Sequence, residues 1–412
     1  MKEIVVQKYG GSSIASLVRI EKVAGYIKKI AESKNVVVVV SAMGDETDRL
    51  KTLAKEISSN PDPAELDKLI STGENQSAAL LTMALLKLGQ KAVSLSGFHI
   101  GLTTDFNHGN ARVKEIQNIG RIQKLLEQNK VVVIAGFQGV VDGSDELVTL
   151  GRGGSDLTAI ALSAALKTGE CEIYTDVDGV YAIDPRIIPQ AKRYERITYS
   201  QMIQLAGAGS GVLMARSVIL AQNLGVRIKT LLSPSIGESS GGTLVYSGSS
   251  LQEMERGFSD LPGIAVQNNL RLIKISNIPN KPGALAEILK PISGINILQS
   301  VQGGGEEKAD VSFLYQKEDL TEVIPKLNEL RKKGIKVESD KEVVELTLVD
   351  PTAKDRPGYF YRISKALAKA GINIEMFAAA GVEMMVVIRQ EDLHNAAKTL
   401  AEEFKSLESS IC

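Results

Sequence analysis

Residues 4–43 read IVVQKYGGSSIASLVRIEKVAGYIKKIAESKNVVVVVSAM, and this stretch decides the fold. It begins with a short β-branched run at Ile4–Val6, turns at a glycine pair, and continues as a helical pattern over Arg19–Ala31. The pure valine run Val36–Val40 then predicts a strand that is buried on both faces of a sheet. A strand, a helix and a second strand in this order indicate a mostly parallel sheet covered by helices.

The same alternation continues as far as the Ser- and Gly-rich stretch Ser233–Ser250, which predicts a domain boundary. Short apolar runs predict the further strands, which are Lys91–Leu95, Val131–Ala135, Glu172–Tyr174 and Arg227–Lys229. Longer segments between them predict the helices Gln76–Leu88, Ala111–Gln128 and Ser155–Ala165. We therefore expect an α/β fold, a three-layer α/β/α sandwich with a mostly parallel sheet.

The rest of the chain contains an internal repeat. A Pro-Gly pair and a Gly-Ile-Asn-Ile string occur twice, at Pro282-Gly283 with Gly294–Ile297, and after Arg356 at Pro357-Gly358 with Gly371–Ile374. Each copy has the pattern of a ferredoxin-like βαββαβ unit. The expected domains are residues 1–248, 262–338 and 339–412.

The composition bears on whether the protein binds nucleic acids. The chain has 412 residues, of which 43% are hydrophobic and 24% charged, and its formal net charge is −1. It has no Trp, and aromatic residues make up only 4%. Near-neutral charge and few aromatic rings argue against a nucleic-acid-binding protein.

The small number of cysteines and histidines limits which disulfides and metal sites the protein can form. Two cysteines, Cys171 and Cys412, cannot form a disulfide framework. Three histidines, His99, His108 and His394, show no metal-ligand spacing, so any metal is expected to be a hard ion with oxygen ligands, such as Mg²⁺. No apolar run has the length of a membrane span or the form of a signal peptide. We expect a soluble cytoplasmic protein without membrane partners.

Two glycine-rich loops follow predicted strands. In Lys8-Tyr9-Gly10-Gly11-Ser12-Ser13, tandem glycines let backbone N–H groups approach phosphate oxygens, and Lys8 adds a positive charge. In Gly151-Arg152-Gly153-Gly154-Ser155-Asp156, Arg152 can bind a carboxylate and Ser155 or Asp156 can cap the next helix. The alternatives are a tight turn with a solvated lysine for the first loop and simple capping for the second.

Three further polar segments are candidates for the same site. Thr175-Asp176-Val177-Asp178-Gly179-Val180-Tyr181, with Asp184-Pro185-Arg186, follows a strand, and so does the segment from Ser41 to Thr47. Ser71-Thr72-Gly73-Glu74 precedes a predicted helix and also fits N-terminal capping. The loops at Lys8, Ser41, Arg152 and Asp176 are expected to share the ligand-binding edge of one parallel sheet.

In combination, these motifs resemble those of the aspartokinases, members of the amino acid kinase family. The resemblance covers nearly the whole chain and includes the two carboxy-terminal repeats, which are similar to ACT domains. It implies transfer of the γ-phosphoryl group of ATP to the β-carboxylate of L-aspartate, giving 4-phospho-L-aspartate. In the family this reaction begins the biosynthesis of lysine, threonine and methionine.

The resemblance also implies residue roles. Lys8, Arg152 and Asp156 would be catalytic, with Lys8 stabilising the transferring phosphoryl group. The residues implied to bind aspartate are Ser41, Thr47, Glu74, Arg152 and Ser155, with Glu74 facing the ammonium and Arg152 the α-carboxylate. The residues implied to bind ATP are Lys8, Gly10, Gly11, Ser12, Thr175, Asp176, Tyr181, Asp184 and Arg186, and Mg²⁺ would be carried mainly by the phosphates, with no dedicated protein metal site.

The chain departs from the family pattern at several places, and three of them bear most on function. Gly211 stands where the family has a nucleotide-binding lysine, for which Lys229 is a candidate replacement. Asn280 replaces an aspartate of the first repeat, and Ala378–Ala380 replaces a Ser/Thr-rich stretch of the second. Asn280, Gln299 and Ser300 are the residues implied to face a lysine or threonine effector. We expect weak feedback or none, and a homodimer formed through the repeats.

Two alternatives remain at this point. One is a related kinase that phosphorylates another small carboxylate, and the acceptor that yields ADP would identify it. The other is a weakly catalytic regulatory protein built on ACT domains. Gly211 and the neighbouring change at Met214-Ala215 favour it, and Lys8, Glu74, Arg152 and Asp176 oppose it.

Overall fold

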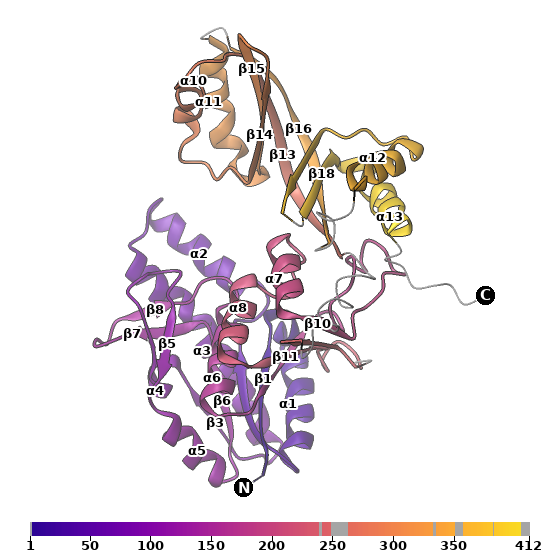
Figure 1. Cartoon of the computed structure of the whole chain (residues 1–412). Helices are drawn as coiled ribbons and strands as arrows, with labels where there is room; N and C mark the ends of the chain where they lie inside the picture. The colour runs from indigo at the N-terminus through magenta and orange to yellow at the C-terminus, as the bar shows by residue number, and fades with distance from the viewer. Residues whose placement is uncertain are drawn as a thin grey trace, which may run out of the picture. The chain divides into compact units, whose positions relative to one another are not determined.

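The computed structural model describes residues 2–238, 241–248, 263–332, 335–350, 357–381 and 383–404. These residues fall into two compact units (Figure 1). The first takes the described residues of 1–180, 193–207 and 211–254, and the second takes those of 181–192, 208–210 and 255–412. Residues 249–262, which include the whole stretch between the predicted first and second domains, lie outside the described residues, as do Arg356 and Cys412.

The first unit is built on an eight-stranded sheet in the order β10-β12-β11-β9-β1-β2-β6-β3. Every neighbouring pair is parallel except β11 with β12. All six strands predicted from apolar runs are present: β1 (Ile4–Tyr9), β2 (Asn35–Val40), β3 (Ala92–Leu95), β6 (Val131–Ala135), β9 (Glu170–Thr175) and β11 (Arg227–Leu232). The other two are β10 (Arg196–Thr198) and β12 (Thr243–Tyr246). The stretch Ser233–Ser250 is therefore not a plain linker, because it contains β12.

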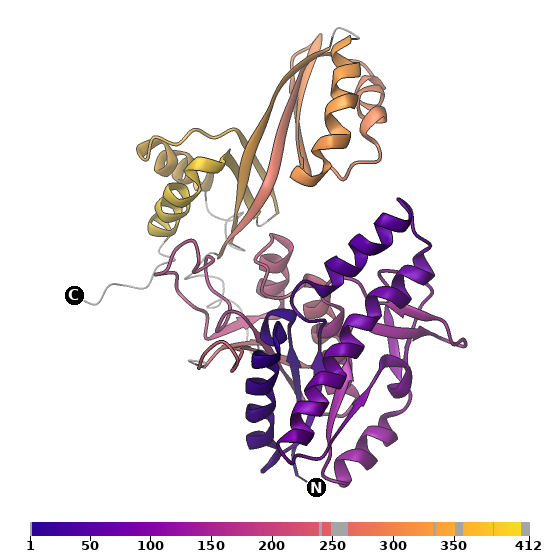
Figure 2. The ribbon, with the colours of Figure 1, turned by 180° about the vertical axis from the view of Figure 1, so that it is seen from behind.

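Helices cover both faces of this sheet, as the sequence predicts. α1 (Leu17–Ala31) and α3 (Pro63–Lys87) lie side by side on one face (Figure 2) and share an apolar core with β2. α6 (Gly154–Ala165) packs on β1, β2 and β9, and α8 (Ala215–Leu224) packs on α6 and β11. The predicted three-layer α/β/α sandwich is confirmed.

Two predictions about the helices are wrong. The long helix begins at Pro63, where the Asp62 side chain accepts hydrogen bonds from the backbone N–H groups of Ala64 and Glu65 at 3.0 and 3.1 Å. Ser71–Glu74 therefore lies inside α3 and caps nothing. The predicted helix Ala111–Gln128 is in fact strand β5 (Val113–Ile116) followed by α5 (Ile119–Glu127).

The first unit also contains a second, four-stranded sheet, which the sequence patterns do not predict. Its order is β5-β4-β7-β8, with β4 (Leu102–Thr104), β7 (Gln138–Val141) and β8 (Leu147–Thr149) joining β5. Arg152 follows β8, so it comes from this small sheet and not, as predicted, from the edge of the main sheet. The remaining elements of the first unit are α2 (Glu46–Ile57), α4 (Gly97–Ile100), α7 (Tyr199–Gly207) and a 3₁₀ turn at Gly11–Ile14.

The second unit is built on a six-stranded sheet in the order β14-β15-β13-β16-β18-β17. Its elements are β13 (Gly263–Pro279), α10 (Ala284–Leu289), β14 (Gln299–Gly304), β15 (Lys308–Gln316), α11 (Leu320–Lys332), β16 (Lys336–Val349), α12 (Tyr359–Lys369), β17 (Met376–Ala380), β18 (Glu383–Arg389) and α13 (Leu393–Glu403). Gly283 and Gly358, the glycines of the repeated Pro-Gly pairs, both have φ of +88° and stand directly before α10 and α12. Glycine adopts this left-handed conformation without strain, which explains its recurrence.

The two repeats share their long strands. The first part of β13, Gly263–Gln267, pairs with the last part of β16, Glu345–Val349, and a register shift follows at Gln267. Residues Leu270–Pro279 then pair with β15 of the first repeat. The beginning of β13 therefore belongs to the sheet of the second repeat, and the rest of β13 forms the first strand of the first repeat.

Among the described residues, no helix is both long enough and apolar enough to cross a membrane. Cys171 lies buried in β9 as a free thiol.

Candidate active site

A pocket of about 490 Å³ lies in the first unit at the carboxyl ends of β1 and β2. Parallel strands present their carboxyl ends at one edge, where α/β proteins bind ligands. Many residues predicted from the sequence line it, namely Lys8, Gly11, Ser41, Thr47, Glu74, Arg152, Ser155 and Asp156. The pocket thus brings together segments that lie far apart in the sequence.

A nearly buried ion pair forms one wall of the pocket. The Nζ atom of Lys8, in β1, lies 2.7 Å from Oδ1 of Asp156, and these side chains are only 12% and 8% exposed. The backbone at Gly10 packs directly beside the amine, since a Cβ there would lie in ordinary contact with Lys8 Nζ at 3.4 Å. Asp156 thereby holds the Lys8 ammonium in one place at the mouth of the glycine-rich turn.

A buried carboxylate forms another part of the lining. Glu74 is 3% exposed, and its Oε1 accepts a hydrogen bond from the backbone N–H of Ala42 at 3.0 Å. Its other oxygen, Oε2, is buried and has no hydrogen-bond partner. Burial raises the pKa of Glu74 to about 7, although the Ala42 N–H works in the opposite direction. An ammonium group in the pocket would supply the missing partner.

Glycines let the polar loops approach closely. A Cβ on Gly73 would lie 2.8 Å from the Cβ of Ala42, so Gly73 allows α3 to approach the loop after β2. A Cβ on Gly11 would lie 2.9 Å from the carbonyl oxygen of Ala42. The N–H of Gly44 donates to the carbonyl of Gly11 at 3.1 Å and fixes the same approach.

The loop at Arg152 leads into the amino end of α6. Gly151 and Gly153 have φ of +74° and +73°, which favours glycine at both positions. Gly153 stands at the N-cap without a side-chain cap, so the predicted capping by Ser155 or Asp156 is not found. Ser155 and Asp156 are both buried and line the pocket instead. The exposed Arg152 lies at the same opening.

Of the residues predicted to bind ATP, only some line the pocket. Gly10 and Ser12 flank the pocket-lining Gly11 without lining the pocket themselves, and Thr175 and Asp176 lie at the end of β9, also outside the pocket lining. Thr175 Oγ1 donates to Asp176 Oδ1 at 3.0 Å. The remaining three residues, Tyr181, Asp184 and Arg186, belong to segment 181–192 of the second unit. There Asp184 and Arg186 form an ion pair of 2.7 Å.

The predicted effector residues lie in the second unit. Asn280 Nδ2 donates to the carbonyl of Gly305 at 2.7 Å, and Ser300 is exposed on β14. Gln299 Nε2 contacts Met385 Sδ of β18 at 2.9 Å, while Gln299 Oε1 is buried without a hydrogen-bond partner. Gln299 thereby connects the two repeats.

Sequence reasoning missed several residues of the pocket, including Asp48, Lys51, Asp67, Phe137 and Thr149. Asp67 is the most informative, because it lies seven residues before Glu74 in α3. Two helical turns separate the two carboxylates, so they share one face of the helix. This signal is in the sequence but is visible only once α3 is known to begin at Pro63. In the described part of the chain, no group of three or more His, Cys, Asp or Glu side chains could hold a metal ion.

Comparisons with known proteins match the chain nearly from end to end. Residues 3–230 match the amino acid kinase family, and residues 346–404 match an ACT domain. An aspartokinase of Pseudomonas aeruginosa is 39% identical over 98% of this chain and 97% of its own. The crystal structure of aspartate kinase from Synechocystis is 32% identical, covers 99% of this chain and 70% of its own, and has a TM-score of 0.54. The fold is also that of E. coli aspartokinase III in complex with aspartate and ADP, with a TM-score of 0.70 at 22% identity over 97% of this chain and 99% of the other.

Proposed function

The chain belongs to the aspartokinases of the amino acid kinase family, and from this premise we propose how its pocket carries out their reaction. The protein is an aspartate kinase, which transfers a phosphoryl group from ATP to aspartate. The roles of the individual residues are our proposal, and they rest on the pocket described above. The observation that carries it is the buried, unpartnered Oε2 of Glu74 in a pocket that also holds Lys8 and Arg152.

Aspartate is placed by opposite charges at its two ends. Glu74 receives the ammonium group, because a buried carboxylate with a free oxygen is stabilised by a cation. Arg152 receives the α-carboxylate, since the planar guanidinium binds carboxylates through two parallel hydrogen bonds. The hydroxyl groups of Ser41, Thr47 and Ser155 supply hydrogen bonds around the same pocket. This arrangement leaves the β-carboxylate facing Lys8.

Phosphoryl transfer to a carboxylate needs charge stabilisation and no general base. The acceptor is already an anion at neutral pH, so the main barrier is the repulsion between it and the phosphates. Lys8, held by Asp156 at 2.7 Å, offsets this negative charge. The backbone N–H groups of Gly10, Gly11 and Ser12 are proposed to cradle the phosphates.

ATP is proposed to contact residues beyond the pocket lining. Thr175 and Asp176, at the end of β9, are two of them, and the resemblance assigns the same role to Tyr181, Asp184 and Arg186. Mg²⁺ would neutralise charge on the β- and γ-phosphates and would be carried chiefly by the phosphate oxygens. The pocket fits this arrangement, because Asp156 is paired with Lys8 and both oxygens of Asp67 already accept hydrogen bonds from the protein.

Four broader features belong to the same proposal. The repeats join two chains into a homodimer and retain at most a weak site for lysine or threonine, since an ACT domain matches the second of them but Asn280 and Ala378–Ala380 depart from the family pattern. The product, an acyl phosphate of aspartate, enters the synthesis of lysine, threonine and methionine. The reaction takes place in the cytoplasm, where ATP and free aspartate are at hand.

The test is ADP release with Mg-ATP and a panel of small carboxylic acids, with hydroxylamine present to trap any acyl phosphate. We expect aspartyl hydroxamate from aspartate, and a rate lower by about a thousandfold in Lys8→Ala. Lys22→Ala, an exposed substitution in α1, is the control and should keep the wild-type rate. No aspartyl hydroxamate above the Lys8→Ala level would refute the assigned reaction.

A further inference from the structure

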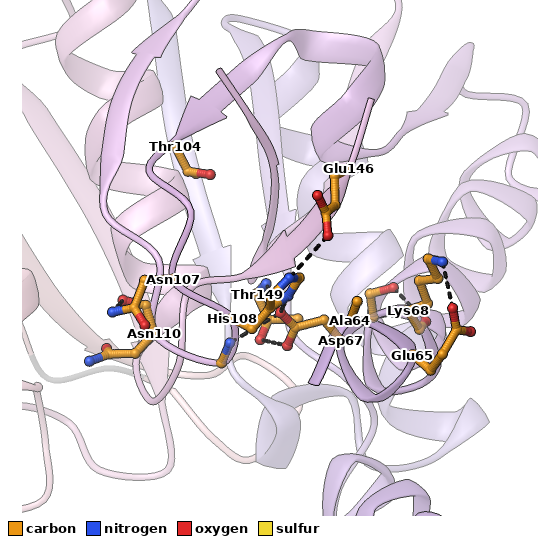
Figure 3. Close-up of polar contacts among 12 residues, drawn as sticks. Ala64, Glu65, Asp67, Lys68, Thr104, Asn107, His108, Asn110, Glu146 and Thr149 are labelled. Carbon is orange, nitrogen blue, oxygen red and sulfur yellow. Dashed lines mark hydrogen bonds and ion pairs between the residues drawn. The ribbon is translucent and has the colours of Figure 1, made fainter. Parts of the chain in front are cut away.

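One carboxylate that the proposed mechanism does not use makes four hydrogen bonds at the pocket. Asp67 is 1% exposed and lies in α3 (Figure 3). Its Oδ1 accepts from Thr149 Oγ1 at 2.5 Å, and its Oδ2 accepts from the N–H groups of Thr149 and Gly109, both at 3.1 Å. The fourth partner is His108 Nδ1, 2.8 Å from Oδ2. Because it is buried and both of its oxygens already bond protein groups, Asp67 acts on the protein and not on the substrate.

These bonds tie together three segments. Asp67 belongs to α3, Thr149 ends β8, and His108 and Gly109 belong to the loop 105–112 between β4 and β5. On its other side, His108 Nε2 lies 3.1 Å from Oε1 of Glu146, the residue before β8 (Figure 3). The imidazole therefore lies between two carboxylates. Since a carboxylate only accepts hydrogen bonds, both ring nitrogens donate when the ring is protonated.

The fastened loop touches the segment that carries Arg152. A Cβ on Gly151 would lie 2.8 Å from the carbonyl oxygen of Gly109, so the two backbones are in contact. The N–H of Ala111 donates to the carbonyl of Thr149 at 3.0 Å. Arg216 Nη1 bonds both Asn110 Oδ1 and the carbonyl of Leu150 at 2.6 Å. A shift of the loop must therefore be felt at Gly151 and, one residue on, at Arg152.

We infer that Asp67 and His108 are positioning residues that hold the loop 105–112 against β8 and so fix Arg152 for the α-carboxylate of the substrate. This inference rests on the proposed function, in which Arg152 binds aspartate. Neither residue is predicted from the sequence to belong to the site. Both act through Arg152, so they set the affinity for aspartate and not the chemistry of transfer.

The protonation of His108 links this device to pH. Burial alone would lower the pKa of His108, but the hydrogen bonds and charges of Asp67 and Glu146 outweigh it and raise the pKa above its ordinary value. Asp67 on α3 and Glu146 before β8 are the charged groups that contact the ring. The elements around it also carry Lys68 and Glu65 on α3, Asp105 and Arg112 on the loop, and Arg216 on α8, which bonds Asn110 of the loop. The ammonium of Lys68 is paired with Glu65 at 2.7 Å, and the carboxylate of Asp105 accepts a hydrogen bond from the backbone N–H of Arg112. The two carboxylates in contact with the ring therefore dominate.

The direction of the effect follows from the raised pKa. Below it the imidazolium donates to both carboxylates, and the loop is fastened. As the pH rises through it, the neutral ring keeps one N–H and loses one of the two bonds. Aspartate should then bind more weakly, so its KM should rise on the alkaline side while the KM for ATP stays constant.

The test compares KM for aspartate, KM for ATP and kcat between about pH 6 and 8.5 in wild type, His108→Gln and Glu146→Gln. His108→Gln should raise KM for aspartate about tenfold near pH 6.5, leave kcat and KM for ATP nearly unchanged, and abolish the alkaline rise. Glu146→Gln should move that rise to lower pH, because it removes one of the charges that favour the imidazolium. His99→Gln in α4 is the matched control and should reproduce the wild-type profile.

Asp67→Asn adds a second readout, with the same expected increase in KM for aspartate. The two His108 and Glu146 variants still decide the question if Asp67→Asn does not fold, since these side chains lie nearer the surface. The inference is overturned if His108→Gln and His99→Gln have the same KM for aspartate at every pH, or if kcat and both KM values change together. Failure of the proposed function would look different, because wild-type enzyme would then yield no aspartyl hydroxamate.

Discussion

Glu74 shows how burial prepares one residue for its substrate. Its Oε1 is bonded to the N–H of Ala42, its Oε2 has no partner, and burial raises its pKa to about 7. The free enzyme therefore holds a large protonated fraction of Glu74 near neutral pH. Since only the carboxylate attracts an ammonium group, kcat/KM for aspartate should increase as the pH rises through about 7. This quantity reports the ionisation of the free enzyme, which makes it the right measurement.

Substitution at the same position supplies the control. Glu74→Gln should raise KM for aspartate about a hundredfold, because the ammonium loses its charged partner in a buried site, and should remove the acid limb of the profile. Glu65→Gln, on the exposed side of the same helix, should leave the profile unchanged. An acid limb that persists in Glu74→Gln would assign the titration to another group. The alkaline limb predicted for His108 is independent, so the two variants should each remove one side of the pH profile.

The charged residues of the glycine-rich loops could be predicted, because short sequence motifs identify them. Lys8 beside two glycines and Arg152 among three each indicate an anion site from residue types and spacing alone. Asp67 and His108 could not be found in this way, because neither stands in a glycine-rich loop. Their importance comes from hydrogen bonds to Thr149 and Gly109, which are 82 and 42 residues from Asp67 in the sequence.

At the level of elements, strands are easier to predict than helix limits. A parallel strand such as β2 is apolar on both faces, so Val36–Val40 stands out. The predicted form of α3 is too short because Ser71, Thr72 and Gly73 resemble a helix start. In the structure, the hydroxyl groups of Ser71 and Thr72 bond back to carbonyls of their own helix, and Gly73 faces Ala42. The small sheet escapes prediction because β4 and β8 are only three residues long.

The role of Gly73 gives a prediction for α3 as an element. Alanine normally stabilises a helix interior by about 1 kcal/mol relative to glycine. At Gly73 the added methyl would lie 2.8 Å from the Cβ of Ala42 and would displace the loop that bonds Glu74. Gly73→Ala should therefore raise KM for aspartate without stabilising the protein. The measurements are denaturant unfolding and steady-state kinetics.

Helix α1 offers the matched control. Gly25 is also helical, and nothing lies within 4 Å of a Cβ placed there. Gly25→Ala should increase the free energy of unfolding by about 1 kcal/mol and leave the kinetics unchanged. If Gly73→Ala stabilised the protein to the same extent and kept the wild-type KM, the close approach of α3 to Ala42 would not be needed for binding aspartate.

On the scale of the whole molecule, the class of fold and the repeats could be predicted, whereas the sharing of strands could not. The repeat is visible because Pro-Gly turns and Gly-Ile-Asn-Ile strings recur at matched positions. Which strand pairs with which depends on register between distant segments. Gly263–Gln267 pairs with Glu345–Val349, about 80 residues on, and leaves no local mark in the sequence.

The second unit gives a last prediction, on regulation by amino acids. Binding free lysine or threonine requires a partner for an ammonium and hydrogen bonds for a carboxylate. Asn280 is neutral, and its amide already donates to the carbonyl of Gly305 at 2.7 Å. Ala378–Ala380 in β17 offers only methyl groups where the family has hydroxyls. Lysine, threonine or both together should therefore inhibit aspartyl hydroxamate formation weakly or not at all.

Asn280→Asp should strengthen any response to lysine, because it supplies the missing charge. Strong synergistic inhibition of the wild-type enzyme below about 1 mM, a free energy of about 4 kcal/mol, would contradict this interpretation of the two substitutions.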